Sequence, residues 1–311
     1  MPILRVGKTK KVFPTGNPNF AVMQSFPSAV SAEEADPFLM CDHFGPTLSH
    51  GIEEDPDSFP VGWHPHRGMD VLTYITEGVG RHADSLGNRE TFASPGMQWI
   101  SVGSGVEHAE GGGTPAGQTT EGFQIWVNVP SEKKMYDPRY GTEPPENIPT
   151  FRGDAVFGRV LAGTVGDVTG PFRTVQPVQI LDLSLSPLSS LSPPSSSSYT
   201  HEIPSFLNNC ILHVYRGAGT INGVVVKKND VIHLDAMDPA KRGVTLAGSD
   251  AESLSLLLFA GARLNQPIAW HGPFVMTTDE EVQRAMREYR SGTFLKKRAD
   301  WDYKKIASKP K

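Results

Sequence analysis

Turn-forming residues interrupt this chain throughout and limit the regular structure that it can form. Its 311 residues include 31 glycines and 26 prolines, a content that favours many short segments over long helices. Runs rich in β-branched and aromatic residues lie between these turns, for example over 71–76 and 123–129. Short strands at this spacing are typical of a sandwich or barrel. We therefore expect an all-β fold.

The pattern also predicts two domains. The chain is long for a single core, and proline and glycine gather over 136–150 as in an interdomain linker. Strand-like segments resume after this stretch in an order similar to that of the first half, so we predict a duplicated β-barrel unit with domains at 1–141 and 142–311. A serine-rich stretch over 186–198 lies between two predicted strands. We interpret it as an extended loop that is a passive insertion.

One helix is predicted near the C-terminus, over 279–291. Thr278 and Glu281 form a capping box at its start, and Gly292 is suited to end it. Four residues at helical spacing define one face, namely Val282, Ala285, Met286 and Tyr289. This pattern predicts a helix that packs against the protein and carries no chemistry.

Composition excludes several classes of protein. The formal net charge of −5 provides no basic footprint for nucleic acid, and no stretch approaches the roughly 20 apolar residues of a membrane helix. The chain has only two cysteines, Cys41 and Cys210, which favours a reducing, intracellular location. We expect a cytoplasmic monomer, with the nucleus as an alternative compartment. A basic cluster over 296–305 is interpreted as a solvated terminus in preference to a nuclear-import signal.

Two pairs of residues carry the clearest chemical signal. His64 and His66 form one pair, and His108 and Glu110 form the other. Because residues i and i+2 of a β-strand point to the same face, each pair can aim both side chains into one space. Three imidazoles and one carboxylate suit a divalent transition metal such as Fe, Mn, Ni, Cu or Zn. Two unrelated strands are the alternative, but the repeated spacing favours one metal site.

Longer runs around these residues resemble the pirin family of the cupin superfamily. The runs that carry the resemblance are 36–46, 64–74, 82–88, 95–99, 103–110 and 270–276. The resemblance implies two stacked cupin-type antiparallel β-barrels with a short C-terminal helix, and one metal, usually iron, in the N-terminal barrel. By position, it implies that the metal ligands are His64, His66, His108 and Glu110.

Some positions depart from the family pattern or stand outside it. Pirins usually have Glu where this chain has Asp70 and an aromatic residue where it has Met69; the shorter Asp70 is not expected to reach the metal. Arg67 is expected to brace its strand in preference to lining the pocket. His213 and His233 stand alone in predicted strands, so we expect no metal in the second barrel. Further histidines interpreted as structural are His43 and His82.

The resemblance implies two functions. The first is quercetin 2,3-dioxygenase activity on a flavonol or similar aromatic substrate, in which Glu110 takes the 3-hydroxyl proton and O2 cleaves the heterocycle with loss of carbon monoxide. Phe44, Met97 and Trp99 are candidates for an apolar wall, although core packing explains them equally well. The second is an iron-dependent redox-sensing transcriptional co-regulator that acts by binding a protein partner. We favour the first.

Overall fold

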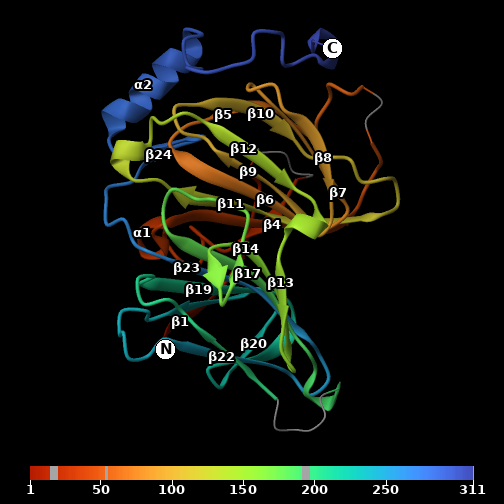
Figure 1. Ribbon diagram of the computed structural model, residues 1–311, viewed down its shortest axis with the longest axis vertical. Helices are drawn as coiled ribbons and strands as arrows, with labels where there is room; N and C mark the ends of the chain where they lie inside the picture. Colours follow the sequence, from red (N-terminus) through yellow and green to blue (C-terminus); the bar gives the residue numbers. More distant parts are fainter. Residues whose placement is uncertain (15–19, 53–54, 191–196, 311) are drawn as a thin grey trace. The chain divides into compact units, whose positions relative to one another are not determined.

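The chain forms two compact units, and neither is contiguous in sequence. The computed structural model describes residues 1–14, 20–52, 55–190 and 197–310. Unit 1 comprises Met1–His43 and Asn147–Arg263, and unit 2 comprises Phe44–Glu146 and Leu264–Lys311. Strands dominate both units (Figure 1), and the described ranges contain two α-helices, α1 (Ala32–Ala35) and α2 (Asp279–Arg290). The predicted all-β fold is confirmed.

Unit 2 is built on antiparallel sheets. One has the strand order β5-β10-β7-β8, and a second follows the path β12-β9-β6-β11-β4. Its elements are β5 (Val61–His66), β6 (Met69–Glu77), β7 (Val79–Asp84), β8 (Arg89–Ala93), β9 (Gly96–Ser101), β10 (Val106–Glu110), β11 (Thr119–Asn128), η1 (Ser131–Lys133), β12 (Arg139–Glu143), β24 (Ala269–His271), β25 (Phe274–Met276), α2 and η5 (Ile306–Ser308). Strand β4 (Phe38–Leu48) and the 3-10 helix η2 (Pro145–Asn147) run across the boundary with unit 1.

Unit 1 has one extended antiparallel sheet with the strand path β1-β21-β19-β23-β17-β14-β13. Its apolar core draws on side chains from most of these strands, including Leu183, Leu212, Ile232 and Leu258, all fully buried. The elements are β1 (Ile3–Lys8), β2 (Lys10–Val12), β3 (Val22–Gln24), α1, β13 (Thr150–Arg152), β14 (Val156–Ala162), β15 (Thr164–Val165), β16 (Val168–Thr169), β17 (Val178–Leu185), η3 (Leu188–Ser190), β18 (Tyr199–Glu202), β19 (Asn209–Ile221), β20 (Val224–Lys227), β21 (Asp230–Leu234), β22 (Gly243–Gly248) and β23 (Leu254–Gly261).

The compact units differ from the predicted domains 1–141 and 142–311 in both terminal segments. Strand β1 pairs antiparallel with β21, with Val6 opposite Ile232, so the N-terminal strand belongs to the unit built mainly from the second half of the chain. Conversely, residues 264–311 return to unit 2. The boundary between the halves, at 146/147, falls within the predicted linker. Each unit is thus completed by a segment from the opposite end of the chain.

Helix α2 forms as its sequence predicts. Thr278 is the N-cap, and the reciprocal bonds of the capping box with Glu281 are both present. Val282 and Ala285 are buried, and Met286 packs beside them against Phe274 and Met276 of β25. Figure 1 shows α2, coloured blue, beside β24. The expected packing helix over 279–291 is confirmed to within one residue of its end.

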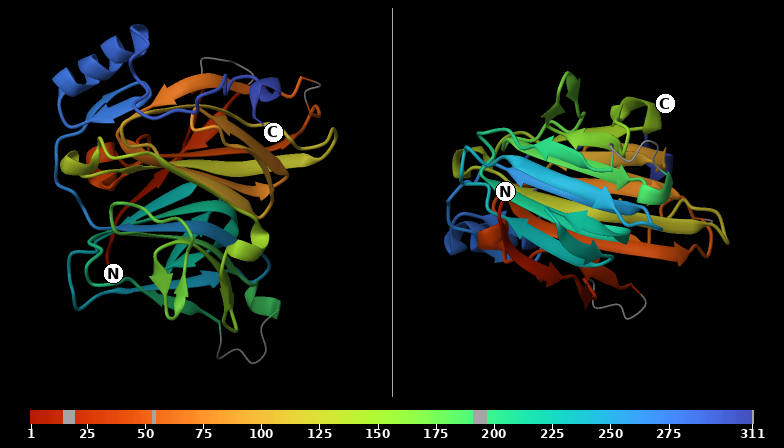
Figure 2. Two further views of the ribbon diagram at one scale, coloured as in Figure 1. Left: turned by 45° about the horizontal axis from the view of Figure 1, so that its top comes forward. Right: turned by 90° about the horizontal axis from the view of Figure 1, so that it is seen from below.

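The basic side chains of the C-terminal segment are largely exposed, as expected for a solvated terminus, but the segment also contacts unit 2. Lys297 pairs with Asp137 at 2.5 Å, and the Tyr303 hydroxyl donates to Glu107. The ring of Tyr303 lies 5.3 Å from that of Trp63, centroid to centroid. The left view of Figure 2 shows this segment, in dark blue, over the orange strands of the same unit.

The serine-rich stretch is described only in part, and no helix is suited to span a membrane in the described ranges. Of the serine-rich stretch 186–198, residues 191–196 lie outside the described residues, and Leu188–Ser190 form η3. None of the helices in the described ranges has the length and apolar character needed to cross a membrane.

Candidate metal centre

Three predicted ligands meet in unit 2. His64 and His66 end β5, and His108 lies on β10 directly opposite His64 in the antiparallel register. The ring centroids are 4.3 Å apart for His64 and His108, 4.8 Å for His64 and His66, and 4.9 Å for His66 and His108. One nitrogen from each ring can be chosen so that all three lie within 4.8 Å of one another. Alternation along two paired strands thus brings the imidazoles together as predicted.

The hydrogen bonds of the histidines leave nitrogen lone pairs available. His64 Nδ1 lies 2.7 Å from the carbonyl oxygen of Gly62, and His66 Nδ1 lies 3.3 Å from that of Pro273. A carbonyl can only accept, so both Nδ1 atoms carry the proton and both Nε2 atoms have a free lone pair. Ligating histidines commonly donate their second nitrogen in this way.

Burial favours the neutral form of two of these rings. His66 is 3% exposed and His108 is fully buried. Loss of hydration lowers the pKa of both well below the usual histidine value, and the nearby His64 lowers it further. Neutral imidazole is the form that binds a metal. The pKa shifts therefore favour ligation at neutral pH.

The donor set fits a metal ion. Within the described ranges, His66 Nε2 and both nitrogens of His108 are buried without a hydrogen-bond partner. Leaving a buried polar atom unpaired costs about 1–3 kcal/mol. Unpaired buried atoms that converge on one point therefore indicate a bound ligand or ion. Three convergent nitrogens suit Fe, Ni, Cu or Zn better than a hard cation.

Glu110, the fourth predicted ligand, lies outside this group of three histidines. Its Oε1 accepts from Gln124 Nε2 at 2.6 Å, and its Oε2 lies 3.0 Å from Thr73 Oγ1. The register between β10 and β5 shifts between His108 and Glu110, with the extra residue on β5, where His64 and Val61 are their partners. Glu110 as a metal ligand stays a prediction.

Several other residues take structural places. Asp70 is buried and accepts from the Tyr136 hydroxyl at 2.7 Å. His82 Nε2 lies 3.1 Å from Asp84 Oδ2, and its ring centroid is 5.5 Å from that of His108. In unit 1, His233 contacts Asn209 through Nε2 and Oδ1 at 2.9 Å. These partners agree with the structural roles that we expected.

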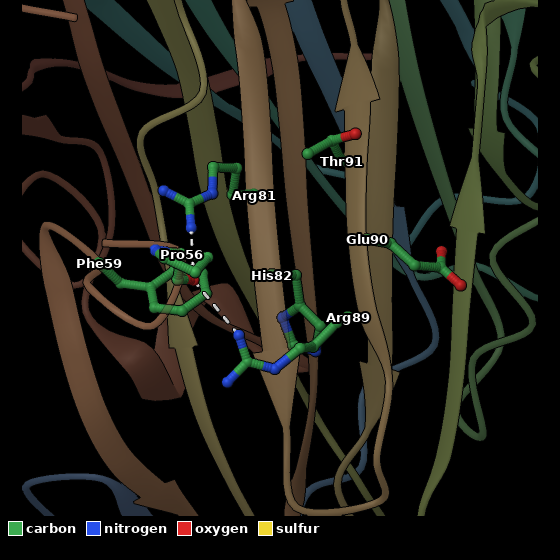
Figure 3. A pocket seen from close by; sticks show the side chains of 7 residues that line it. All are labelled: Pro56, Phe59, Arg81, His82, Arg89, Glu90 and Thr91. Atoms are coloured by element: carbon green, nitrogen blue, oxygen red, sulfur yellow. Dashed lines mark hydrogen bonds between the residues drawn. The ribbon is translucent and has the colours of Figure 1, made fainter. Parts of the chain in front are cut away.

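A pocket of about 410 Å³ lies beside β7 and β8. Figure 3 shows its lining side chains, and none of the four predicted ligands is among them: they are Pro56, Phe59, Arg81, His82, Arg89, Glu90 and Thr91. Arg81 and Arg89 both donate to the Pro56 carbonyl oxygen. The two guanidinium groups thus hold the loop that forms one wall, and we do not assign this pocket to the substrate.

Comparison with known proteins identifies the family. A family model described as pirin matches residues 19–127, and the model of the pirin C-terminal cupin domain matches residues 191–295. The chain belongs to the pirin family.

Relatives and solved structures agree with this assignment. A Pseudomonas aeruginosa protein provisionally named as a quercetin 2,3-dioxygenase is 33% identical over 268 residues, 84% of this chain and 88% of that protein. The crystal structure of a quercetin 2,3-dioxygenase from Acinetobacter baumannii has a TM-score of 0.80 at 27% identity and covers 94% of this chain and 97% of its own. An Escherichia coli pirin in complex with nickel(II) shares the fold, with a TM-score of 0.59 at 20% identity over 83% of this chain and 99% of its own.

Residues that the sequence did not single out surround the pirin site. Thr73 on β6 and Gln124 on β11 stand opposite each other in the register and both contact Glu110. Trp126, two residues after Gln124, is buried, and its ring centroid is 5.0 Å from that of His66. The spacing of Gln124 and Trp126 places them on one face of β11, and this alternation is the signal that could have revealed them.

The three apolar-wall candidates have other surroundings. Met97 is fully buried, and the Trp99 indole packs over Gly141 and donates to Glu143 at 3.3 Å. The ring of Phe44 lies against Gly122. Burial supports core packing for Met97, whereas Phe44 and Trp99 are only partly buried. The ring of Trp126, in contrast, lies close to that of His66.

Proposed function

We propose that this pirin is a metal-dependent dioxygenase of the quercetin 2,3-dioxygenase type that acts on a flavonol or a similar planar aromatic substrate, with iron as the metal. The observation that carries the proposal is the three-histidine group with a carboxylate two residues beyond His108 on the same strand. The named activity of the Acinetobacter relative supports it. Its residues would be His64, His66 and His108 as ligands and Glu110 as ligand and general base.

When bound, the metal supplies a Lewis acid that polarises the substrate oxygen and makes its hydroxyl more acidic. The chain itself must then accept the proton. Two carboxylates lie close to His108 in sequence, Glu107 and Glu110. The oxygens of Glu110 are oriented by Gln124 and Thr73. Glu107 is instead engaged by Tyr303 of the C-terminal segment. A general base that is positioned in this way typically contributes about 10²–10⁴-fold to the reaction rate.

The side chains of Glu110, Thr73 and Gln124 contact one another in a closed ring. This ring has one proton too few for all of its contacts to be hydrogen bonds when Glu110 is ionised. Thr73 Oγ1 lies 2.6 Å from Gln124 Oε1 and 3.0 Å from Glu110 Oε2, but a hydroxyl has only one proton to donate. When Glu110 is ionised, one of these two contacts lacks a donor. When Oε2 carries the substrate's proton, Glu110 donates to Thr73, Thr73 donates to Gln124, and Gln124 donates to Oε1. Each contact of the ring therefore has a donor once Glu110 has taken the substrate's proton.

The ring makes a testable prediction. Gln124→Leu and Thr73→Val each remove a hydrogen bond to Glu110, worth about 1.5–3 kcal/mol for a charged partner. We expect kcat for quercetin to fall about 10–100-fold in each variant, compared at equal bound metal. Thr164→Val, which removes a hydroxyl from the exposed β15–β16 hairpin of unit 1, is the matched control. Wild-type kcat in both ring variants would contradict the assignment.

The activity itself is tested directly. Purified protein is loaded separately with Fe(II), Ni(II), Co(II), Mn(II) or Cu(II) and mixed with quercetin in air. We expect loss of the flavonol absorbance together with release of carbon monoxide, at rates that scale with bound metal. Absence of turnover with all five metals would exclude the dioxygenase. The redox-sensing co-regulator, the protein partner, the monomeric state and the compartment stay predictions.

A further inference from the structure

A segment from the far end of the chain holds the turn that carries His66. We call residues 273–294 the C-terminal clamp; it comprises β25, α2 and the turn after it. Its Pro273 carbonyl oxygen is the partner of His66 Nδ1. The Val275 amide donates to the Arg67 carbonyl oxygen at 3.1 Å, and Arg67 forms a parallel bridge with Phe274. The backbone around one ligand is therefore fixed by residues about two hundred positions away in sequence.

Arg67 extends this connection through its side chain. The residue is 1% exposed, and its guanidinium group uses three different nitrogens. Nε donates to Ser104 O at 2.8 Å, Nη2 donates to Phe294 O at 2.9 Å, and Nη1 pairs with Glu288 of α2 at 2.8 Å. The group also lies over the Phe294 ring, 4.3 Å from its centroid. The planar fork of an arginine suits such simultaneous contacts, and a lysine cannot reproduce them.

The contact with Ser104 links the clamp to the second ligand-bearing strand. Ser104 lies in the turn that leads into β10, the strand of His108. It is followed by Gly105, where an added Cβ would lie 2.9 Å from the Phe294 ring. A single side chain, Arg67, thus joins the turn after β5 and the turn before β10 to one helix and one aromatic ring.

The turn is tightly enclosed beneath the clamp. Gly68 has φ +86°, and a Cβ at this position would lie 2.1 Å from the Val275 carbonyl oxygen. Lys134, also buried, donates to Gly68 O at 2.8 Å, to Val275 O at 3.1 Å and to Asn128 Oδ1 at 2.7 Å. All three ammonium protons are used. The turn and the clamp therefore share the buried amino group of Lys134, whose pKa is lowered by burial to about 7.

We propose that Arg67 is a positioning residue that couples docking of the C-terminal clamp to metal binding at His64, His66 and His108. Docking orients the His66 ring and the turn before β10, so the ligands are arranged before the metal arrives. By thermodynamic linkage, metal binding stabilises the docked clamp by the same factor. The proposal rests on the three-histidine metal site and is independent of the dioxygenase activity.

The first measurement is metal affinity, with Ni²⁺ as the probe and a chromogenic chelator as competitor. We expect Arg67→Lys to raise the Kd for Ni²⁺ about 10–100-fold, the range found when partners behind metal ligands are removed. Glu288→Gln keeps both carbonyl bonds of Arg67 and should raise the Kd by a smaller factor, about 3–10-fold. Unchanged affinity in folded Glu288→Gln protein would overturn the proposal, even where Arg67→Lys fails to fold.

The second measurement is amide hydrogen exchange in the presence and absence of Ni²⁺. If Arg67 had only a structural role, the effect of Ni²⁺ on exchange in the clamp would not depend on its contacts. Addition of Ni²⁺ to the wild-type protein should slow exchange across 273–294, including the Val275 amide, and this protection should weaken in Glu288→Gln. Exchange in the clamp that does not respond to Ni²⁺ would contradict the coupling. If the wild-type protein bound no Ni²⁺, the metal site itself would be refuted. Failure of the metal site can therefore be distinguished from failure of the coupling.

Two matched controls complete the design. Arg242 in unit 1 also ties chain segments together, because its guanidinium donates to the carbonyl oxygens of Ile203, Pro204, Ala236 and Leu207. Arg242→Lys should lower the melting temperature without changing the Kd for Ni²⁺. Lys296→Gln removes the second cation that pairs with Glu288 but leaves Arg67 intact, so it should also bind Ni²⁺ normally. A Kd raised equally in either control would show a general loss of stability and overturn the coupling.

Discussion

Replacement of His108 by alanine should abolish specific metal binding. The wild-type protein is expected to bind one Ni²⁺ or Fe²⁺ per chain, and His108→Ala should raise the Kd by more than about 100-fold, because losing a ligand exceeds the 10–100-fold cost of losing an outer partner. His108 is fully buried between His64 and His66, and neither of its nitrogens has a hydrogen-bond partner among the described residues. Metal ligation gives a physical reason for its position and for one of its two unpaired nitrogens.

Stability provides a second readout for the same variant. A ligand that binds only the folded state stabilises it by about 2.7 kcal/mol at a free concentration of 100 times the Kd. Addition of Ni²⁺ should therefore raise the melting temperature of the wild-type protein and leave that of His108→Ala unchanged. His213→Ala is the control, because His213 is equally buried but lies in unit 1. Full retention of Ni²⁺ by His108→Ala would contradict the ligand assignment.

The local parts of the fold could be predicted because their signals lie within a few residues. The capping box of α2 spans only Thr278 to Glu281, and the strands of unit 2 are visible as alternating runs between turns. The terminal segments could not be placed in this way. Pairing of β1 with β21 and return of residues 264–311 to unit 2 depend on contacts between distant positions. Composition and periodicity contain no record of such partners.

The same distinction applies to the site. Spacing two residues apart was sufficient to group His64, His66 and His108, because strand alternation alone determines their common face. The surroundings of Glu110 were less predictable, because the residues that contact its carboxylate lie on other strands. Thr73 and Gln124 meet Glu110 through the register of β6 against β11. A register between strands some fifty residues apart is set by packing and cannot be read from either strand.

Replacement of Glu110 by glutamine should remove turnover while preserving the structure around it. In the Glu110→Gln variant the new side-chain carbonyl would still accept from Gln124, and the new amide would donate to Thr73 in the way that protonated Glu110 does. The variant therefore imitates the state in which the proton has already been taken. With every contact of the ring supplied with a donor, its melting temperature should equal or exceed that of the wild-type protein. Because an amide cannot act as the base, kcat for quercetin should fall about 10²–10⁴-fold.

The combination of retained stability and lost turnover distinguishes a base from a residue that only supports the fold. Steady-state assays at saturating Ni²⁺ or Fe²⁺ separate the proton-accepting role of Glu110 from its predicted role as a ligand, because each variant is then compared at equal metal content. Glu132→Gln, which changes an exposed carboxylate on η1, should leave kcat unaltered. If Glu110→Gln keeps more than about a tenth of the wild-type kcat, so that its loss is less than the smallest contribution expected of a general base, the proton must go elsewhere. In that case the ring of Glu110, Thr73 and Gln124 only braces β10 against β6 and β11.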